Sequence, residues 1–416
     1  MTGDYITNIN AGMTYFVTQL REEQISLNWD IGLLAFIFSE MHYRVFGTIC
    51  TLKNSAVSPR TLNGKSQNMK SFSVNYQSLI RKLEDGLPFA LLSQQTSPLG
   101  EMLHECFRSC FKSVFSAEHG YFGLAGPGEK TASSRHPRWK VPVHSLYGET
   151  RKPTPAMMKG IKRIVIDLQD IGIRCYTYLA TLKLVMESAV ENGVEVMVLD
   201  RPVPLGGIVD GPMPDADRMS FVCPADLPLC HGMTIGEEAI YLSKTIPGVK
   251  LSVVKMKGWN HEMCEPWADF LPPSPGIKSW DSAVLYPVTV FTEAFPALDT
   301  DRSGNLAFRV LGAEWMDPQK LIKATEAKLR EYGLAVREYR WGKIAGVLLS
   351  IESIKRYRPA AAGMTLLAAI RKLWPKQLAE GAREEWLTKL MGGVSYDPSK
   401  WGQTLSRYRK LRVNLY

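Results

Sequence analysis

Four short apolar runs of this chain each end in a cluster of polar side chains. The runs have the length of β-strands, and segments of helical length separate them. Such a pattern predicts a parallel sheet of βαβ units, which binds ligands beyond the carboxyl ends of its strands. We therefore expect the polar clusters to form one site. The four junctions are 89–92 with 93–96, 111–115 with 118–120, 164–166 with 167–170, and 196–199 with 200–202.

The alternation of helix and strand divides the chain into three parts. Residues 76–299 predict a Rossmann-like catalytic domain with a doubly wound parallel sheet. After a Pro-rich, aromatic stretch, residues 300–416 predict a second, smaller α/β domain at the C-terminus. Residues 1–75 show weak periodicity and a Ser/Asn-rich stretch, so we interpret them as an appendage of uncertain structure, a linker or the product of a mistaken start codon.

Charge and cysteine content narrow the class of protein. The net charge of +9 would suit a polyanion, but the basic residues are widely spread, so we expect no nucleic-acid partner. The one dense basic run, 407–412, predicts a solvated tail helix. The seven cysteines form no CxxC pair and are expected to be mostly reduced core thiols. No transmembrane segment is expected, because the apolar run 31–38 is too short to span a bilayer, and no signal peptide is visible since the first basic residue is Arg21.

Other uses of a Rossmann-like sheet are disfavoured by the turns that they require. The turn after the first strand, 93–100, lacks the GxGxxG pattern of dinucleotide-binding proteins. Residues 123–131 come close to a phosphate-binding loop, but one extra residue displaces the lysine and Pro127 removes an amide donor. The sequence contains no GxSxG elbow and no HExxH helix. We expect no cofactor and no metal, because the histidines lack ligand-like spacing.

An ordered series of motifs resembles the exo-β-N-acetylmuramidase family, long known as a domain of unknown function. The resemblance covers about 87–416 and implies a Rossmann-like domain, a smaller C-terminal domain and a sugar site between them. It also implies the release of terminal β-linked N-acetylmuramic acid from the non-reducing ends of peptidoglycan fragments. The motifs are Glu118-His-Gly-Tyr121, Ser145-Leu-Tyr-Gly148, Asp167-Leu-Gln-Asp170, Gly172-Ile-Arg174, Tyr176-Thr-Tyr178, Leu199-Asp-Arg-Pro202, Gly206-Gly207 and His231-Gly-Met-Thr234.

Glycoside hydrolysis needs a carboxyl group that donates a proton and a second group that attacks or stabilises positive charge. We expect Glu118 to be the proton donor, because it follows a strand end and Gly120 allows close approach of a ligand. Three roles remain open for His119, which are to orient Glu118, to bind substrate or to serve only in the structure. Asp170 is the candidate for charge stabilisation, although one aspartate of this segment has the alternative of pairing with Arg174. Asp200 and Glu293 are further carboxylate candidates.

The remaining predicted site residues are substrate ligands. Arg174 and Arg201 are candidates for binding the lactyl carboxylate of muramic acid, since guanidinium binds carboxylate bidentately. Asp200 and Arg201 have the alternative of forming their own ion pair. Tyr176 and Tyr178 face one way in an extended segment, either to stack on a sugar or to pack in the core. The other candidates are Asp167, Gln169, His231 and Glu293, whereas Thr234 and Glu237 match a helix-capping box.

Some positions depart from the family pattern. Val203 replaces an asparagine, Gly276 replaces a polar residue, and residues 293–296 and 301–304 are reduced forms of the family's Glu-Gly-Thr-Asn and Gly-Arg-Gly-Thr. Three hypotheses therefore stand: a working glycosidase, a catalytically weak wall-sugar-binding relative and a nucleotide-using α/β enzyme. We favour the glycosidase, acting on peptidoglycan fragments or muropeptide-derived sugars. The resemblance suggests the cell envelope or secretion, while the cysteines also allow a cytoplasmic location.

Overall fold

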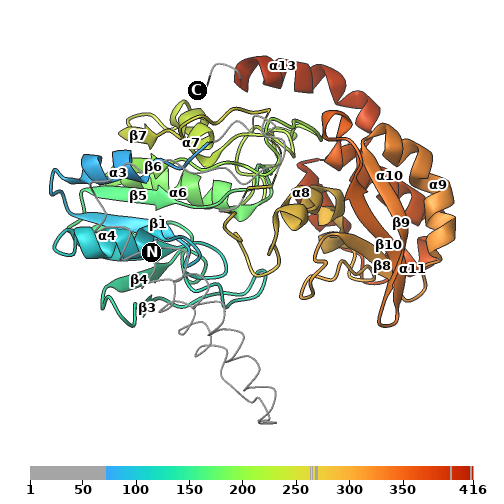
Figure 1. Cartoon of the computed structure of the whole chain (residues 1–416), viewed down its shortest axis with the longest axis horizontal. Helices are drawn as coiled ribbons and strands as arrows, with labels where there is room; N and C mark the ends of the chain where they lie inside the picture. Colours follow the sequence, from blue (N-terminus) through green and yellow to red (C-terminus); the bar gives the residue numbers. More distant parts are fainter. Residues whose placement is uncertain are drawn as a thin grey trace, which may run out of the picture. The chain divides into compact units, whose positions relative to one another are not determined.

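The computed structural model describes residues 72–262, 264, 266–267, 270–393, 396–412 and 415. The predictions for 1–71, including the apolar run 31–38 and Cys50, lie outside the described residues. Figure 1 shows how the described helices and strands are arranged. Within the described residues, no helix is both long and apolar enough to cross a membrane.

A seven-stranded sheet forms the first part of the described chain (Figure 1). Its strand order is β3-β4-β2-β1-β5-β6-β7, and all neighbours are parallel except β3 and β4. The chain reverses its winding direction between β1 and β5, which is where ligands usually bind such sheets. The strands are β1 (Phe89–Ser93), β2 (Phe111–Ser116), β3 (Ser134–Arg135), β4 (Pro142–Ser145), β5 (Arg163–Asp167), β6 (Glu195–Leu199) and β7 (Leu251–Val254).

Helices cover both faces of this sheet, as predicted for a doubly wound fold. Because successive strand residues point to opposite faces, Leu91 of β1 packs with Leu79 and Leu103 on one side. Leu92 packs with Leu182 on the other side. The helices are α3 (Tyr76–Leu83), α4 (Leu99–Cys106), α5 (Pro155–Met158), α6 (Thr177–Glu191) and α7 (Ile235–Ser243).

The sequence prediction missed the edge strand β3 and its neighbour β4. Strand β4 is only four residues long, begins with Pro142 and is half-buried at alternate positions. A short strand of this kind lacks the continuous apolar run that marks a buried strand. Strands β1, β2, β5 and β6 were predicted correctly, because most of their residues are buried and each contains a short apolar stretch.

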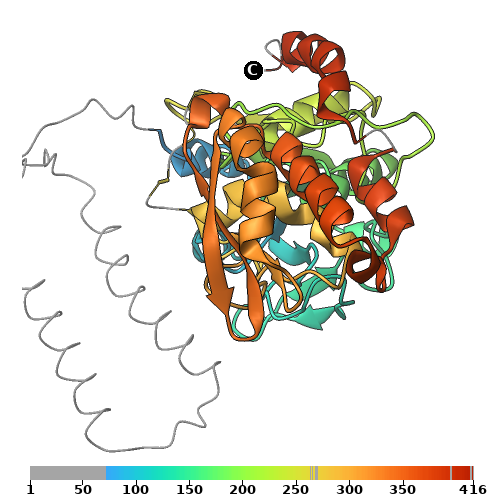
Figure 2. The ribbon, with the colours of Figure 1, turned by 90° about the vertical axis from the view of Figure 1, so that its right-hand side faces the viewer.

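The second part contains a three-stranded antiparallel sheet in the order β8-β10-β9. This confirms the predicted smaller α/β domain, although β8 was not expected. Figure 2 shows this sheet with α9 and α10, in orange, facing the viewer. The strands are β8 (Val310–Ala313), β9 (Leu334–Trp341) and β10 (Ile344–Ile351), and the helices are α9 (Pro318–Glu331), α10 (Pro359–Leu373), α11 (Pro375–Ala379) and α12 (Glu384–Met391).

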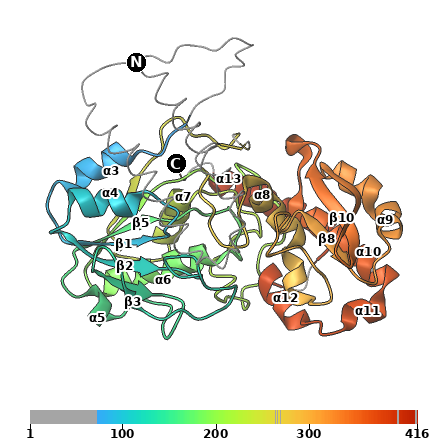
Figure 3. The ribbon, with the colours of Figure 1, turned by 60° about the horizontal axis from the view of Figure 1, so that its bottom comes forward.

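Helix α8 (Trp280–Thr289) and the 3₁₀ helix η1 (Val290–Ala294) connect the two parts. Figure 3 shows α8 between the two sheets. Both elements pack against α10. An ion pair also joins the parts, because the half-exposed Arg358 donates to the buried Asp210 at 3.2 Å and the amide of Ala361 donates to the same carboxylate at 2.9 Å.

The basic run at the end of the chain is not a solvated tail, which corrects the sequence interpretation. Helix α13 (Gly402–Arg412) buries Leu405 and Tyr408. The Tyr408 hydroxyl donates to the carbonyl of His231 at 3.0 Å, and Arg412 donates to the carbonyls of Gly207 and Gly232, each at 3.0 Å. The helix therefore packs against the loops at the carboxyl end of the seven-stranded sheet.

Candidate active site

Glu118 lies just beyond the carboxyl end of β2, where the sequence placed it, and it is half-buried. Its Oε2 accepts a hydrogen bond from the Thr177 hydroxyl at 2.7 Å. Its Oε1 accepts from the amide of Gly128 at 2.8 Å, because the glycine-rich loop after β2 folds back over the carboxylate. An ionised carboxylate satisfies both donors.

His119 shapes this loop rather than contacting Glu118 through its ring. It adopts a left-handed conformation with φ of 71°, and its Nδ1 lies 2.9 Å from the carbonyl oxygen of Ala125. These contacts favour the structural role of His119, which was one of the alternatives left open by the sequence.

Glu293 of η1 is the second carboxylate near Glu118. Its Oε1 accepts a hydrogen bond from the Tyr286 hydroxyl at 3.0 Å. Burial raises the pKa of Glu293, the nearby Arg302 guanidinium opposes this, and the charge of Glu118 raises the pKa further. The two carboxyl groups therefore interact electrostatically although they come from the two different parts of the chain.

Aromatic side chains surround the two carboxyl groups. Burial raises the pKa of Tyr147, and the neighbouring charges of Glu118 and Glu293 contribute to this shift. The rings of Tyr176 and Tyr178 pack edge to face with centroids 4.8 Å apart, and both are buried. The expected extended segment is wrong, because α6 begins at Thr177. Both tyrosines take the core-packing alternative, and Thr177 rather than either ring contacts Glu118.

Asp167 and Arg201 form a buried ion pair where the sheet reverses its winding direction. The Asp167 Oδ1 accepts from Arg201 Nε at 2.5 Å, and both side chains are almost inaccessible to solvent. Arg201 also donates to the hydroxyls of Tyr76 at 2.9 Å and Ser97 at 3.1 Å. Both residues therefore neutralise each other inside the protein, and the alternative pairing of Asp200 with Arg201 is wrong.

Asp200 organises the start of α7. Its carboxylate accepts from the amide of Gly236 at 2.8 Å and from the Thr234 hydroxyl at 3.0 Å. The predicted capping box is confirmed, because Thr234 and Glu237 each bind the other's backbone amide. Asp200 is thus used for helix capping.

Arg174 is the largest fully buried side chain of the described residues, and it is not available to a substrate. Its Nη1 donates to the carbonyls of Leu227 at 2.6 Å and Pro212 at 3.0 Å, and its Nη2 donates to that of Leu390 at 3.2 Å. The role in lactyl recognition and the alternative pairing with Asp170 are therefore both unsupported. Arg174 instead connects loops of the first part to the end of α12.

Asp170, His231 and Glu238 form a buried titratable cluster. The Asp170 Oδ1 accepts from the amide of Gly172 at 2.7 Å, and His231 Nε2 lies 3.6 Å from Glu238 Oε1. Burial raises the pKa of Asp170 to about 7, and burial followed by the charge of Asp170 raises the pKa of Glu238. Burial also lowers the pKa of His231 to about 3. The neighbouring Gln169 is buried and donates to the carbonyl of Pro202 at 2.7 Å.

The tautomer of His231 decides what this cluster suits. One ligand atom each of Asp170, His231 and Glu238 lies within 4.8 Å of the others, which is close enough to consider a metal ion. However, His231 Nδ1 accepts from the amide of Met233 at 3.2 Å, so the neutral ring carries its proton on Nε2, facing Glu238. Metal ligation through Nε2 would require that proton on Nδ1, against the Met233 amide. Within the described residues, Asp170 Oδ2, both oxygens of Glu238 and His231 Nε2 have no hydrogen-bond partner, and burial raises the pKa of both carboxyl groups, which favours their neutral forms.

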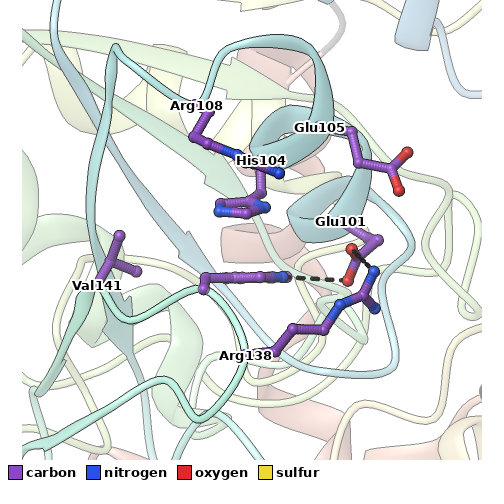
Figure 4. A pocket seen from close by; sticks show the side chains of 7 residues that line it. Glu101, His104, Glu105, Arg108, Arg138 and Val141 are labelled. Carbon is purple, nitrogen blue, oxygen red and sulfur yellow. Dashed lines mark hydrogen bonds and ion pairs between the residues drawn. The ribbon is translucent and has the colours of Figure 1, made fainter.

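A surface hollow of about 290 Å³ lies beside α4 (Figure 4). Two of its charges are paired, since Glu101 binds Arg138 at 2.9 Å, and Glu101 also accepts from the Trp139 indole at 3.2 Å. None of the predicted site residues lines it, so we assign it no role in the chemistry.

The sequence analysis missed the residues that complete the surroundings of Glu118 and Glu293. These residues lie in segments far apart in the chain, and no local pattern joins them. Tyr147 and Thr177 carried a signal as members of the motifs 145–148 and 176–178, and Arg302 as the arginine of the altered 301–304 segment. The missed residues are Gly128, Tyr147, Thr177, Tyr286 and Arg302.

Comparisons with known proteins cover both parts of the described chain. Residues 90–281 match the family described as exo-beta-N-acetylmuramidase NamZ, N-terminal, and residues 284–411 match its C-terminal counterpart. Over 401 residues, the chain is 30% identical to the peptidoglycan beta-N-acetylmuramidase NamZ of Bacillus subtilis (strain 168), and the match covers 88% of this chain and 95% of that protein.

Two crystal structures of DUF1343 family proteins from Bacteroides fragilis NCTC 9343 share the fold. The first has a TM-score of 0.72 and 26% identity, and the match covers 82% of this chain and 96% of that one. The second has a TM-score of 0.60 and 22% identity, with 83% and 97% covered. The second likeness concerns the fold alone.

Proposed function

Because this chain belongs to the exo-β-N-acetylmuramidase NamZ family, we propose that it is an exo-acting β-N-acetylmuramidase. It hydrolyses the bond that joins a terminal β-linked N-acetylmuramic acid to the rest of a peptidoglycan fragment. Its substrates are derived from peptidoglycan. More specifically, we propose that they are muropeptide-derived sugars with a muramic acid at a free non-reducing end.

The single observation that supports this chemistry is that Glu118 lies near enough to Glu293 for its charge to raise the pKa of Glu293. Glycosidases need one carboxyl group that holds a proton and another that stays charged, and different environments separate the two roles. Glu118 accepts one hydrogen bond on each carboxylate oxygen, from the amide of Gly128 and from the Thr177 hydroxyl. Glu293 is half-buried, lies in the field of Glu118, and burial raises its pKa.

The proposed roles therefore differ from those expected from the sequence. Glu293 donates a proton to the leaving oxygen, and Glu118 provides the charge that attacks the sugar, activates water or stabilises the oxocarbenium-like transition state. We assign Asp170 no role as the second carboxylate, because it is buried in a cluster with His231 and Glu238. No cofactor enters this scheme.

The test compares Glu118→Gln and Glu293→Gln on two β-N-acetylmuramides, one with a nitrophenyl leaving group and one with a sugar leaving group. Loss of a proton donor is most severe for a poor leaving group, so Glu293→Gln should lower kcat by about 10²- to 10⁴-fold on the sugar and much less on the nitrophenyl substrate. Glu118→Gln should lower kcat strongly on both substrates.

Glu129→Gln is the matched control, because Glu129 lies in the same loop and its carboxylate only accepts from the amide of Gly126 at 2.7 Å. It should retain most activity. If the leaving-group dependence appears in Glu118→Gln instead, the two roles are reversed. Absence of turnover by the unaltered protein would favour a wall-sugar-binding protein over an enzyme.

A further inference from the structure

Muramic acid differs from glucosamine by a lactyl group whose carboxylate is charged at neutral pH. A site that selects this sugar needs a cation beside the catalytic carboxyl groups, and arginine is the side chain best shaped to bind a carboxylate. Arg174 and Arg201 cannot supply it, since the first donates to buried carbonyls and the second is paired with Asp167. The cation must therefore come from another part of the chain.

Arg302 lies beside Glu293 and is only half-buried. Its Nη2 donates to the hydroxyl of Thr292, the residue before Glu293, at a distance of 3.4 Å. Its guanidinium carbon lies 5.9 Å from the centroid of the Phe308 ring. Its charge also reaches the Tyr286 hydroxyl, which donates to Glu293.

Among the described residues, Arg302 has no ion-pair partner. Across the part of the chain that the structure describes, no carboxylate oxygen lies within 4.0 Å of its guanidinium group. Arg309, in the same segment, is by contrast paired with Asp281 at 3.6 Å. A half-buried arginine with one long hydrogen bond therefore retains donors for an anion.

The loop that carries Arg302 is built to hold it in place. Asp301 adopts a left-handed conformation with φ of 51°, and its Oδ2 accepts from the amide of Leu306 at 2.9 Å. The amide of Gly304 donates to the Asp301 carbonyl at 2.8 Å, and a Cβ at Gly304 would lie 2.0 Å from Asp301 Oδ1. The turn therefore positions Arg302 by packing and hydrogen bonds on both sides of it.

We propose that Arg302 binds the lactyl carboxylate of the terminal N-acetylmuramic acid and thereby selects this sugar over N-acetylglucosamine. The inference rests on the proposed function, because it names the group that recognises the substrate of the same site. Arg302 is a substrate-binding residue and takes no part in proton transfer. The charged group that it recognises is absent from glucosamine and is neutral in a lactyl ester.

The experiment uses the full chain and three nitrophenyl β-glycosides, those of N-acetylmuramic acid, its lactyl methyl ester and N-acetylglucosamine. Arg302→Gln should lower kcat/KM for the acid by about 10- to 100-fold, mainly through KM, because charged hydrogen bonds are worth about 1.5–3 kcal/mol. Any effect of the lost charge on the pKa of Glu293 is common to all three substrates, so the ratio of kcat/KM for the acid to kcat/KM for the ester measures the lactyl contact and should fall by about 10-fold or more. Arg302→Lys should restore part of the loss, since it keeps the charge without the bidentate geometry.

Arg309→Gln is the matched control and should leave the ratio of acid to ester unchanged. Arg151→Gln tests a rival cation, whose guanidinium carbon lies 4.1 Å from the Phe221 ring centroid on the Tyr147 side of the site. Equal losses on acid and ester in Arg302→Gln, or a selective loss in Arg151→Gln alone, would overturn the proposal. Thermal unfolding checks each variant, and if Arg302→Gln is unfolded, the acid-to-ester ratio of Arg302→Lys decides.

Calorimetric binding of free N-acetylmuramic acid separates this proposal from the proposed function. If the unaltered protein turns over none of the glycosides, the proposed activity fails. The recognition by Arg302 still stands if the protein binds the acid more tightly than its methyl ester and Arg302→Gln removes that preference. It fails if the protein shows no such preference.

Discussion

At the scale of single residues, the buried cluster of Asp170, His231 and Glu238 dominates the electrostatics away from the catalytic pair. Burial raises the pKa of Asp170 to about 7, so the folded state holds a proton that the unfolded state releases near pH 4. Stability from this group is therefore complete below about pH 4 and is lost as pH rises through about 7. Burial shifts His231 in the opposite direction, with a pKa of about 3, so its contribution falls as pH decreases below about 6.5.

Replacement of one carboxyl group of this cluster should make the protein less sensitive to alkaline pH. We compare the free energy of unfolding of Glu238→Gln with that of the unaltered protein at pH 4 and at pH 8. The difference should shift in favour of Glu238→Gln by on the order of 2 kcal/mol between pH 4 and pH 8, because one buried carboxyl group no longer has to ionise. Urea unfolding at several pH values measures this difference. Glu187→Gln, at a partly exposed carboxylate 3.7 Å from Lys152, is the control. The same stability difference at both pH values would argue against a raised pKa of Glu238 in the folded state.

At the scale of secondary-structure elements, α13 depends on glycines in the loops that it contacts. Gly232 has φ of 59°, and a Cβ there would lie 2.5 Å from Arg412 Nη1 and 2.7 Å from the carbonyl oxygen of Ile208. A side chain at this position would therefore displace both the end of α13 and the loop beneath it. The basic composition of this helix, which suggests a solvated tail, hides the apolar contacts of Leu405 and Tyr408.

Gly232→Ala should loosen α13 more than the strain of its backbone conformation alone explains. Gly248→Ala is the matched control, since Gly248 has φ of 85° but the nearest atom to its added Cβ is 3.7 Å away. Both variants lose about 1 kcal/mol from the positive φ, and only Gly232→Ala should add a clash. Hydrogen exchange of the α13 amides measures the effect. Equal protection of α13 in the two variants would contradict this account.

At the scale of the whole molecule, the candidate site is assembled from both parts of the described chain. Glu118 follows β2 of the seven-stranded sheet, whereas Glu293 belongs to η1, which packs with α10 and α12. Buried contacts such as Asp210 with Arg358 and Arg174 with the carbonyl of Leu390 connect the two parts. Their relative position therefore determines whether the carboxyl groups can act together.

We expect the two parts to unfold in one transition because of these contacts. Arg358→Met leaves the buried Asp210 carboxylate without its half-exposed cation, and should lower the free energy of unfolding by about 1–3 kcal/mol, because the amide of Ala361 still donates to it. Far-ultraviolet circular dichroism and tryptophan fluorescence should report coincident transitions before and after the change. Arg337→Met, on β9 at an exposed position, is the control. Separate transitions in the unaltered protein would show that the parts are independent.

The sequence by itself determined the elements and the place of their polar ends. Short apolar runs identify β1, β2, β5, β6 and β7, and Glu118 and Asp200 lie just beyond strand ends while Asp167 ends β5, because strand length is a local property. The capping box at Thr234 is likewise readable from four consecutive positions.

Only the tertiary structure decided which polar residues remain available to a substrate. The sequence offers four equivalent candidates, which are Asp167, Asp200, Arg174 and Arg201. Folding pairs Asp167 with Arg201 and surrounds Arg174 with backbone carbonyls. It places Asp200 at the start of α7. Folding also brings Glu293 to Glu118. The physical reason is that burial requires each charge to find a partner, and those partners come from segments distant in the chain.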